Sequence, residues 1–427
     1  MFKKLMITTA AVMFSSTLAS GAYAADLGGD CCADLEERVA VLEATTARKG
    51  NRKVSLTISG WVTQQVMGWD DGIDSDAYVV GSLNDLGNRL HFDGEAKINH
   101  EWSAGYMLRL NVENNQGFSA TATNDDGGGG ISVLNSNMWI KSERLGRIRL
   151  GRQSHASDDN WVDLSGAGSI FAANLVTFDG NSFALIAKGS GVRTNATWGT
   201  VGFCQTIGAG IFADCGGDRT NSVRYDTPTI AGFVLSASWG EDDFWDVAIR
   251  HNGQFGDFKT AFAAAYQWND DNRAGATTTT KFSQVNFAFL HEPTGIFGSV
   301  HYGYEDPNTG IDGDHLYLKG GVRAGLNSWG KTVFYGEYGL NNDAYNLGDL
   351  DGDDTNGVQD LGSEFGIGTV TGTEFTRYGV GIVQEIDAAS MAIWVKWKHY
   401  EAEVDGTMGS VDTEDLDIFA AGGAIFF

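Results

Sequence analysis

Charged side chains alternate with apolar ones in many segments of this chain. In the stretch 88–98, NRLHFDGEAKI, Arg89 and His91 fall on one parity, whereas Leu90 and Phe92 fall on the other. A period of two is typical of a β-strand with one charged face and one apolar face. A row of charges of this kind can select ions if it lines a water-filled passage. The charged face therefore requires an architecture that keeps it in contact with water.

Basic residues in similar positions recur along the chain and are candidates for the wall of such a passage. In SAGYMLRLNVEN an arginine alternates with leucines, and in MAIWVKWKHY two lysines alternate with valine and tryptophan. The alternative for any single residue is pairing with a neighbour on the next strand. The candidate wall residues are Arg89, Arg109, Arg147, Arg149, Arg224, Arg250, Arg377, Lys396 and Lys398.

An acidic segment opens the connector 155–218, which is far longer than an ordinary loop and is therefore expected to have a role. Its start, SHASDDNWVDLSGAGSIF, carries Asp158, Asp159 and Asp163. If this segment bends into the passage, its carboxylates oppose the basic wall and create a transverse field in which polar solutes align their dipoles. The segment is thus the candidate constriction, although the sign of its ion selectivity stays open.

A second acidic connector has the spacing of a weak calcium-binding candidate. It contains Asp349, Asp351, Asp353 and Asp360. However, Asp354 stands where a calcium loop needs its turn glycine, and no bidentate glutamate closes the segment. A solvated acidic loop is the alternative, and neither another metal site nor a cofactor is expected.

Composition limits the class of protein. The 427 residues include 58 glycines and 3 prolines, and the formal net charge is −26. So few prolines suit a chain built of paired strands, because proline cannot donate a hydrogen bond to a β-ladder. The strong negative charge argues against a nucleic-acid partner, whose phosphates would be repelled.

Alternating segments and their connectors predict sixteen strands, with short connectors alternating with long ones rich in Gly, Asp, Asn and Thr. An even number of antiparallel strands with this connector rhythm is typical of an outer-membrane β-barrel. The expected strands are 54–69, 88–98, 103–115, 135–145, 147–154, 219–228, 231–240, 244–254, 258–269, 281–291, 296–305, 314–326, 331–341, 374–386, 391–404 and 416–427.

The width of such a barrel decides which face meets water. A sixteen-stranded lumen is too wide for side chains to fill, so apolar faces could not be buried inside it. With the apolar faces against lipid and the charged faces against a water channel, both faces of every strand meet a suitable environment, and the closed ladder pairs the backbone groups. The predicted fold is therefore an all-β, antiparallel transmembrane barrel with short periplasmic turns, long extracellular loops and an inward-folded third loop; a soluble β-sandwich or solenoid is the alternative.

Three domains are expected. Residues 1–24 have the charged start, apolar centre and small-residue cleavage site of a secretory signal peptide. Residues 25–53 contain a short amphipathic helix and a basic linker; the helix could self-associate, dock on the barrel base or fray. Residues 54–427 form the barrel, and export places it in the outer membrane of a Gram-negative cell.

Four cysteines follow the signal segment. Cys204 and Cys215 flank a short glycine-containing stretch and are expected to form a loop disulfide, because the compartment is oxidising. Cys31 and Cys32 are adjacent. They could bridge chains of an oligomer or pair with each other.

Aromatic residues near strand ends are expected to form girdles at the two membrane interfaces. They are Trp69, Trp102, Trp239, Trp245, Trp268 and Trp329. The chain ends in LDIFAAGGAIFF. Its terminal Phe427 is similar to the signal by which the barrel-assembly machinery recognises outer-membrane proteins.

The chain resembles the trimeric general porins of alphaproteobacteria. The resemblance rests on the opening GDCCADLEERVAVLEATTARKGNRKVSLTISGWV, on WGEDDFWDVAIRHNGQFGDFK, on SVRYDTPTIAGFVLSASWG and on the terminal phenylalanine. It covers essentially the whole mature chain. It implies a homotrimer of sixteen-stranded barrels in outer-membrane lipid and lipopolysaccharide, each a passive pore for small hydrophilic solutes and ions, with the third loop narrowing the lumen.

Two other functions are alternatives to a pore. A barrel enzyme would need a nucleophile with a positioned base, but the histidines are scattered and none has a recognisable Ser/His/Asp setting. A structural tether or adhesin would use the N-terminal helix and the loops. This second role could coexist with a pore.

Overall fold

The computed structural model describes residues 53–81, 88–114, 117, 119–125, 129–158, 160–167, 179–202, 219–240, 244–270, 280–306, 311–343 and 361–427. The predicted signal peptide, N-terminal helix, Cys31, Cys32, Cys204, Cys215, Asp159 and the aspartates of the calcium candidate lie outside these residues. No helix within the described ranges is long and apolar enough to cross a membrane.

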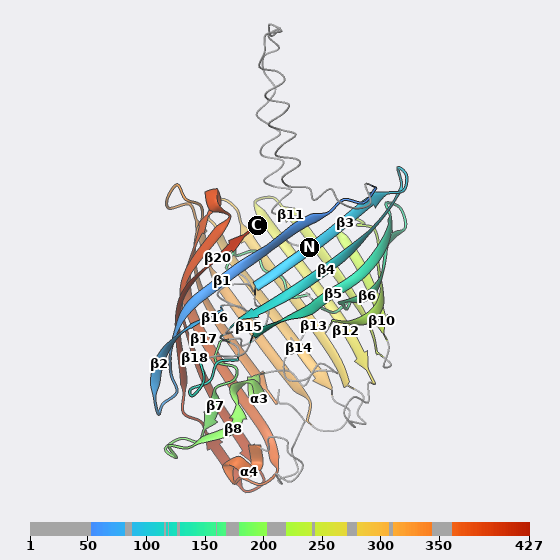
Figure 1. Ribbon diagram of the computed structural model, residues 1–427. Coiled ribbons are helices and arrows are strands. Elements are labelled where there is room, and N and C mark those ends of the chain that lie inside the picture. The colour runs from blue at the N-terminus through green and yellow to red at the C-terminus, as the bar shows by residue number, and fades with distance from the viewer. Residues whose placement is uncertain are drawn as a thin grey trace. The chain divides into compact units, whose positions relative to one another are not determined.

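Sixteen antiparallel strands close into a barrel, as the alternation predicted (Figure 1). The first strand closes the barrel, because β1 pairs with β3 on one side and with the last strand, β20, on the other. The barrel strands are β1 (Thr57–Asp70), β3 (Asn88–Lys97), β4 (Trp102–Asn114), β5 (Gly129–Ser142), β6 (Gly146–Ser154), β9 (Arg219–Asp226), β10 (Phe233–Gly240), β11 (Phe244–Phe255), β12 (Phe258–Asn269), β13 (Thr280–His291), β14 (Ile296–Asp306), β15 (Gly313–Ala324), β16 (Thr332–Asn342), β17 (Val370–Ile386), β18 (Met391–Gly406) and β20 (Leu416–Phe426).

The outward positions of the strands are mostly apolar, and most of the polar residues point inward. In β1, Val62 and Val66 are about half exposed, whereas Thr63 and Gln65 are buried. The same alternation continues around the wall, where exposed Val, Ile, Leu and Phe side chains cover the outer face. Polar residues buried on the inner face would be costly in a dry core, so the inward charges and the outward apolar side chains together fit a wall between lipid and water.

The two ends of the barrel differ. Short connectors join strands at one end of the barrel, here called the turn end. They link β3 to β4, β5 to β6, β9 to β10, β11 to β12, β13 to β14, β15 to β16 and β17 to β18. The other end, the loop end, carries the long connectors, and there β2 (Ser75–Val80) and β19 (Gly409–Asp412) lengthen the wall by pairing with β1 and β18. The small elements β7 (Ala184–Ile186), β8 (Arg193–Thr197), α3 (Trp198–Gly202) and α4 (Leu361–Phe365) also lie at the loop end, and the 3₁₀ turn η4 (Asp387–Ala389) lies at the turn end (Figure 1).

Most of the predicted girdle tryptophans lie on the outer face, but Trp69 does not. Trp239 and Trp329 are about 60% exposed. Trp69 is 3% exposed and packs against Phe183 of the long connector. The prediction for Trp69 was wrong because its odd position in β1 points inward, where the connector supplies an apolar surface to cover it.

Candidate pore interior

Two described segments of the long connector after β6 contact the inner face of the barrel, and the first of them, 155–158 and 160–167, is held by hydrogen bonds. The backbone N–H and hydroxyl of Ser157 both donate to Asp246, at 2.6 and 2.5 Å. Gln284 donates to the Ser157 carbonyl at 2.9 Å, and Arg250 donates to the carbonyls of Ala156 and Asp158. Asp246, Arg250 and Gln284 belong to the wall strands β11 and β13, so this segment is fixed to the wall by polar contacts.

An ion pair fixes the far end of this segment. The ammonium group of Lys319 on β15 contacts the Asp163 carboxylate and also donates to the Ala167 carbonyl at 3.2 Å. The same ammonium group lies 5.8 Å from the ring centre of Trp161. The Lys319 side chain has no exposed surface and that of Asp163 is 10% exposed. The predicted constriction residue Asp163 is therefore paired with a cation of the wall.

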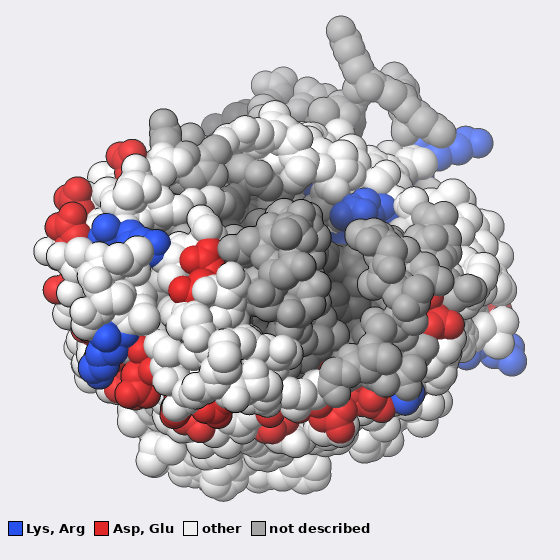
Figure 2. Space-filling view, turned by 90° about the horizontal axis from the view of Figure 1, so that it is seen from below, with Lys and Arg blue, Asp and Glu red and all other residues white. Residues whose placement is uncertain are grey.

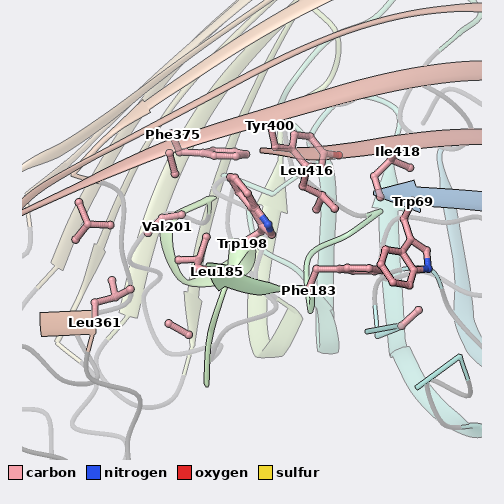
Figure 3. Packing of buried hydrophobic residues seen from close by; sticks show 14 of the residues in the cluster. Trp69, Phe183, Leu185, Trp198, Val201, Leu361, Phe375, Tyr400, Leu416 and Ile418 are labelled. Atoms are coloured by element: carbon pink, nitrogen blue, oxygen red, sulfur yellow. The ribbon is translucent and has the colours of Figure 1, made fainter. Parts of the chain in front are cut away.

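A second segment, 179–202, packs into the barrel through an apolar cluster. Trp198 stacks at an angle against Phe375 and Tyr400 of the wall, with ring centres 5.7 and 5.9 Å apart, and Phe183 contacts Trp69 (Figure 3). All these side chains belong to one buried cluster, which also contains Leu185, Val201, Leu361, Leu416 and Ile418. The segment is further tied to the wall by hydrogen bonds near β19, including Lys188 N–H to the Asp412 carbonyl.

Asp179 opens this second segment inside a shell of positive charge. Its carboxylate contacts Lys396 and accepts from the Gln65 amide at 2.7 Å. Burial by itself would raise the pKa of Asp179, but the charges of Lys396 and Lys398 and the two hydrogen bonds outweigh burial and lower the pKa below its ordinary value. Asp179 therefore stays ionised and binds the segment to the basic wall.

The predicted wall residues fall into separate groups. Arg147, Arg149 and Arg224 gather around one carboxylate, Asp226, at 3.3, 2.7 and 2.9 Å. Ser236 also donates to this carboxylate at 2.8 Å. Three guanidinium groups on one aspartate leave this part of the inner wall with a net positive charge.

A second basic group lies on β17 and β18. Lys398 is 3.6 Å from Glu337, which accepts a hydrogen bond from Tyr317 at 2.7 Å. Arg377 lies 5.2 Å from the ring centre of Tyr317. Arg377, Lys396 and Lys398 are each no more than 5% exposed. Lys398 thus joins Lys396 on the wall that faces Asp179.

The remaining predicted residues lie apart from these groups. Arg89 is buried on β3 with its guanidinium 5.1 Å from the Trp61 ring centre. Arg109 is the register neighbour of His91 on β4. The Asp158 side chain has no exposed surface, and its carboxylate is 3.4 Å from Arg219. Its charge can therefore act on a passing ion through the field but not by direct contact.

Phe427 lies at the closing seam of the barrel. Its backbone N–H donates to the Gly60 carbonyl at 3.1 Å, and the Gly60 N–H donates back at 2.8 Å. A Cβ at position 60 would clash with the Arg89 carbonyl oxygen on β3 and would lie 2.8 Å from the Phe427 ring, so this close approach of the two strands requires glycine. The terminal residue therefore completes the ladder between the last and first strands.

The sequence reasoning missed most of the partners of the predicted charges. Asp226 and Lys319 could have been found, since the alternation of the expected strands places each of them on the face that points into the lumen. Asp179 had none, because it lies in an irregular connector whose path the sequence does not give. Acidic side chains also recur around the rim of the loop end, in agreement with the acidic composition (Figure 2).

Several known proteins share this architecture. An anion-selective porin from Comamonas acidovorans is 15% identical, with 88% of this chain and 100% of that chain covered and a TM-score of 0.55. OmpT of Vibrio cholerae, described as a trimer form, is 12% identical, with 88% and 99% covered and a TM-score of 0.52. OmpF of Salmonella typhi, in complex with daunomycin, is 11% identical, with 89% and 99% covered and a TM-score of 0.52. At these identities the likeness shows the fold alone.

A family model gives the sequence relationship that these structures cannot. No curated protein matches the chain significantly in sequence. The model for Gram-negative porins, in contrast, matches residues 8–388, which is most of the chain. Together with its closed barrel, this match shows that the chain belongs to the Gram-negative porin family and is an outer-membrane channel protein.

Proposed function

We propose that this barrel is a water-filled channel for the passive diffusion of small hydrophilic solutes and ions. The observation that carries the proposal is the inner wall, where ionised side chains line strands whose outer faces are apolar. Such a wall stabilises water and ions inside the barrel while the outer face contacts lipid. The channel contributes no chemistry of its own, and solutes move down their concentration gradients.

The connector segments 155–167 and 179–202 narrow this channel. Both are fixed to inward-facing wall residues, the first through Asp163 and Lys319 and the second through Asp179 and Lys396. Asp158, Asp159 and Asp163 supply the acidic side of the constriction, and the basic wall residues supply the other side. Opposed charges across a narrow passage select solutes by sign and dipole.

A planar-bilayer recording tests the channel directly. The purified protein should insert with stepwise increases in conductance, and the steps should come in groups of three if the channel is a homotrimer. Trimer assembly is itself part of the proposal and rests on the sequence resemblance. A protein that is folded by circular dichroism, inserts into the bilayer and gives no steps would contradict channel function.

The acidic constriction has its own test. Replacement of Asp158, Asp159 and Asp163 by Asn removes three negative charges and should shift the reversal potential in a salt gradient toward lower cation preference. Asp257→Asn, in the short connector between β11 and β12 at the turn end, is the matched control. Equal reversal potentials in the triple variant and the control would exclude these aspartates from the constriction, while stepwise conductance would still show the channel.

A further inference from the structure

A group of metal-ligating side chains lies outside the channel, on the outer face of β18 and just before β20. His399, Glu401 and Asp415 each offer one ligand atom, and these atoms all lie within 4.8 Å of one another. His399 alternates with the inward residues Lys398 and Tyr400, which are buried, so its ring faces outward. None of these three side chains contributes to the constriction.

A fourth carboxylate orients the imidazole. Asp417 is the direct register partner of His399, and its carboxylate is 2.9 Å from His399 Nδ1. A carboxylate can only accept, so Nδ1 donates its proton to Asp417, and Nε2 is the ring nitrogen turned toward Glu401 and Asp415. The Trp397 indole N–H also donates to Asp417 at 2.8 Å, which holds that carboxylate in place.

The environment of Nε2 is strongly negative. Nε2 lies 3.2 Å from the Glu401 carboxylate and 3.9 Å from that of Asp415. Nε2 and the two carboxylates converge on one point, where either a proton on Nε2 donated to Glu401 or a cation in its place offsets the negative charge. The other groups that face the site are the Tyr378 hydroxyl, which donates to Glu401 at 3.2 Å, and Lys188, whose charge acts on Asp415.

We infer that His399, Glu401 and Asp415 bind a divalent metal ion of the zinc type, with Asp417 as the positioning residue. One imidazole with two carboxylates suits Zn²⁺ or Ni²⁺ better than Ca²⁺ or Mg²⁺, which prefer ligands that are all oxygen. A carboxylate on the second ring nitrogen is the usual arrangement behind a metal-ligating histidine.

The location makes the site accessible. The Glu401 and Asp415 side chains are 49% and 45% exposed, so an ion can enter from outside. Tyr378 and Trp397 lie beside the His399 ring, with ring centres 4.9 and 5.9 Å away, and Trp397 packs against Phe419. Aromatic residues of this kind mark the membrane interface, so the bound ion lies at the boundary between the lipid and the water at the loop end.

Calorimetric titration with Zn²⁺ tests the inference on the full chain, folded in detergent and without a polyhistidine tag. The wild type should bind Zn²⁺ with saturation, and His399→Gln should remove one equivalent. Asp417→Asn should weaken that equivalent about 10- to 100-fold, as expected for loss of a carboxylate behind a ligating histidine. Ca²⁺ should compete poorly for the same equivalent.

His100→Gln is the control, because His100 is exposed in a short connector. Each variant is first checked for the heat-resistant mobility of a folded barrel, so that loss of binding is not loss of fold. Equal Zn²⁺ stoichiometry in the wild type and His399→Gln would overturn the inference and leave a proton as the occupant between Nε2 and the carboxylates. Loss of the same equivalent in His100→Gln would also overturn it.

Discussion

The two described segments of the inward connector are held against the same barrel by different physics. Segment 155–167 is bound mainly through hydrogen bonds and ion pairs, with Ser157 on Asp246 and Asp163 on Lys319. Its small apolar residues, among them Val162 and Ala167, join only smaller clusters. Segment 179–202 adds a large apolar cluster around Trp198 to its own ion pair. This cluster is larger than the other buried apolar clusters of the described residues, so it excludes water locally and behaves like the core of a small domain.

The two segments are therefore expected to differ in rigidity, although they belong to the same loop. The apolar segment is expected to form the rigid base, because packing of this kind cannot be exchanged for contacts with water. The polar segment can exchange its hydrogen bonds with water at a small net cost. In the proposed channel the aspartates of the constriction therefore lie on the segment that is held mainly by polar contacts.

The largest effect is expected from removing the centre of the apolar cluster. Trp198→Ala would leave a cavity against Phe375 and Tyr400 and should lower the opening free energy of segment 179–202 by about 3–5 kcal/mol. Native-state hydrogen exchange of the segment's amides measures this quantity. Trp239→Ala, on the exposed outer face, is the control and should leave these amides unchanged; equal protection in both variants would show that the cluster does not hold the segment.

The ion pair of the same segment should have a similar or slightly smaller effect. Asp179→Asn leaves Lys396 buried without its carboxylate partner, which should cost about 3 kcal/mol. Lys259→Gln breaks an exposed pair with Glu292 at 2.6 Å and should cost about 0–1 kcal/mol. Denaturant unfolding in detergent compares the two variants, and a smaller loss for Asp179→Asn than for Lys259→Gln would count against a structural role for this pair.

The polar segment should respond less to a single change. Ser157→Ala removes the hydroxyl donor to Asp246 but keeps the backbone N–H donor, so about 1.5–3 kcal/mol of local stability should be lost. The amides of 155–165 should then exchange faster while those of 179–202 stay protected. Faster exchange in both segments would show that they open as one unit and would remove the contrast between them.

The smallest effect is expected from mild acid. The pKa of Asp179 is lowered in the folded protein, so its contribution to stability is present above its ordinary pKa of 3.8 and is lost only as the pH falls through the lowered value. Protection of segment 179–202 should therefore be the same at pH 7 and pH 5. Loss of protection already at pH 5, with the barrel still folded, would mean that Asp179 is not held by Lys396 and Lys398.

Much of the fold could be predicted from the sequence. Period-two alternation, as in Arg89 and His91 against Leu90 and Phe92, determines which residues share a face, because side chains of a strand alternate by geometry. All sixteen expected strands correspond to barrel strands. The inward direction of Lys396 and Lys398 follows from the same parity.

The partners of those charges were decided by the tertiary structure. Asp226 meets Arg149 across strands 77 residues apart, and Asp179 meets Lys396 at a separation of 217 residues. No local pattern encodes such pairs, since they depend on barrel closure and on the path of an irregular connector. Trp69 illustrates the limit, because strand parity turns it inward, whereas the contact with Phe183 that buries it depends on a connector whose path only the folded barrel decides. The sequence by itself determined which side of each strand is polar, and the three-dimensional fold determined which charges meet.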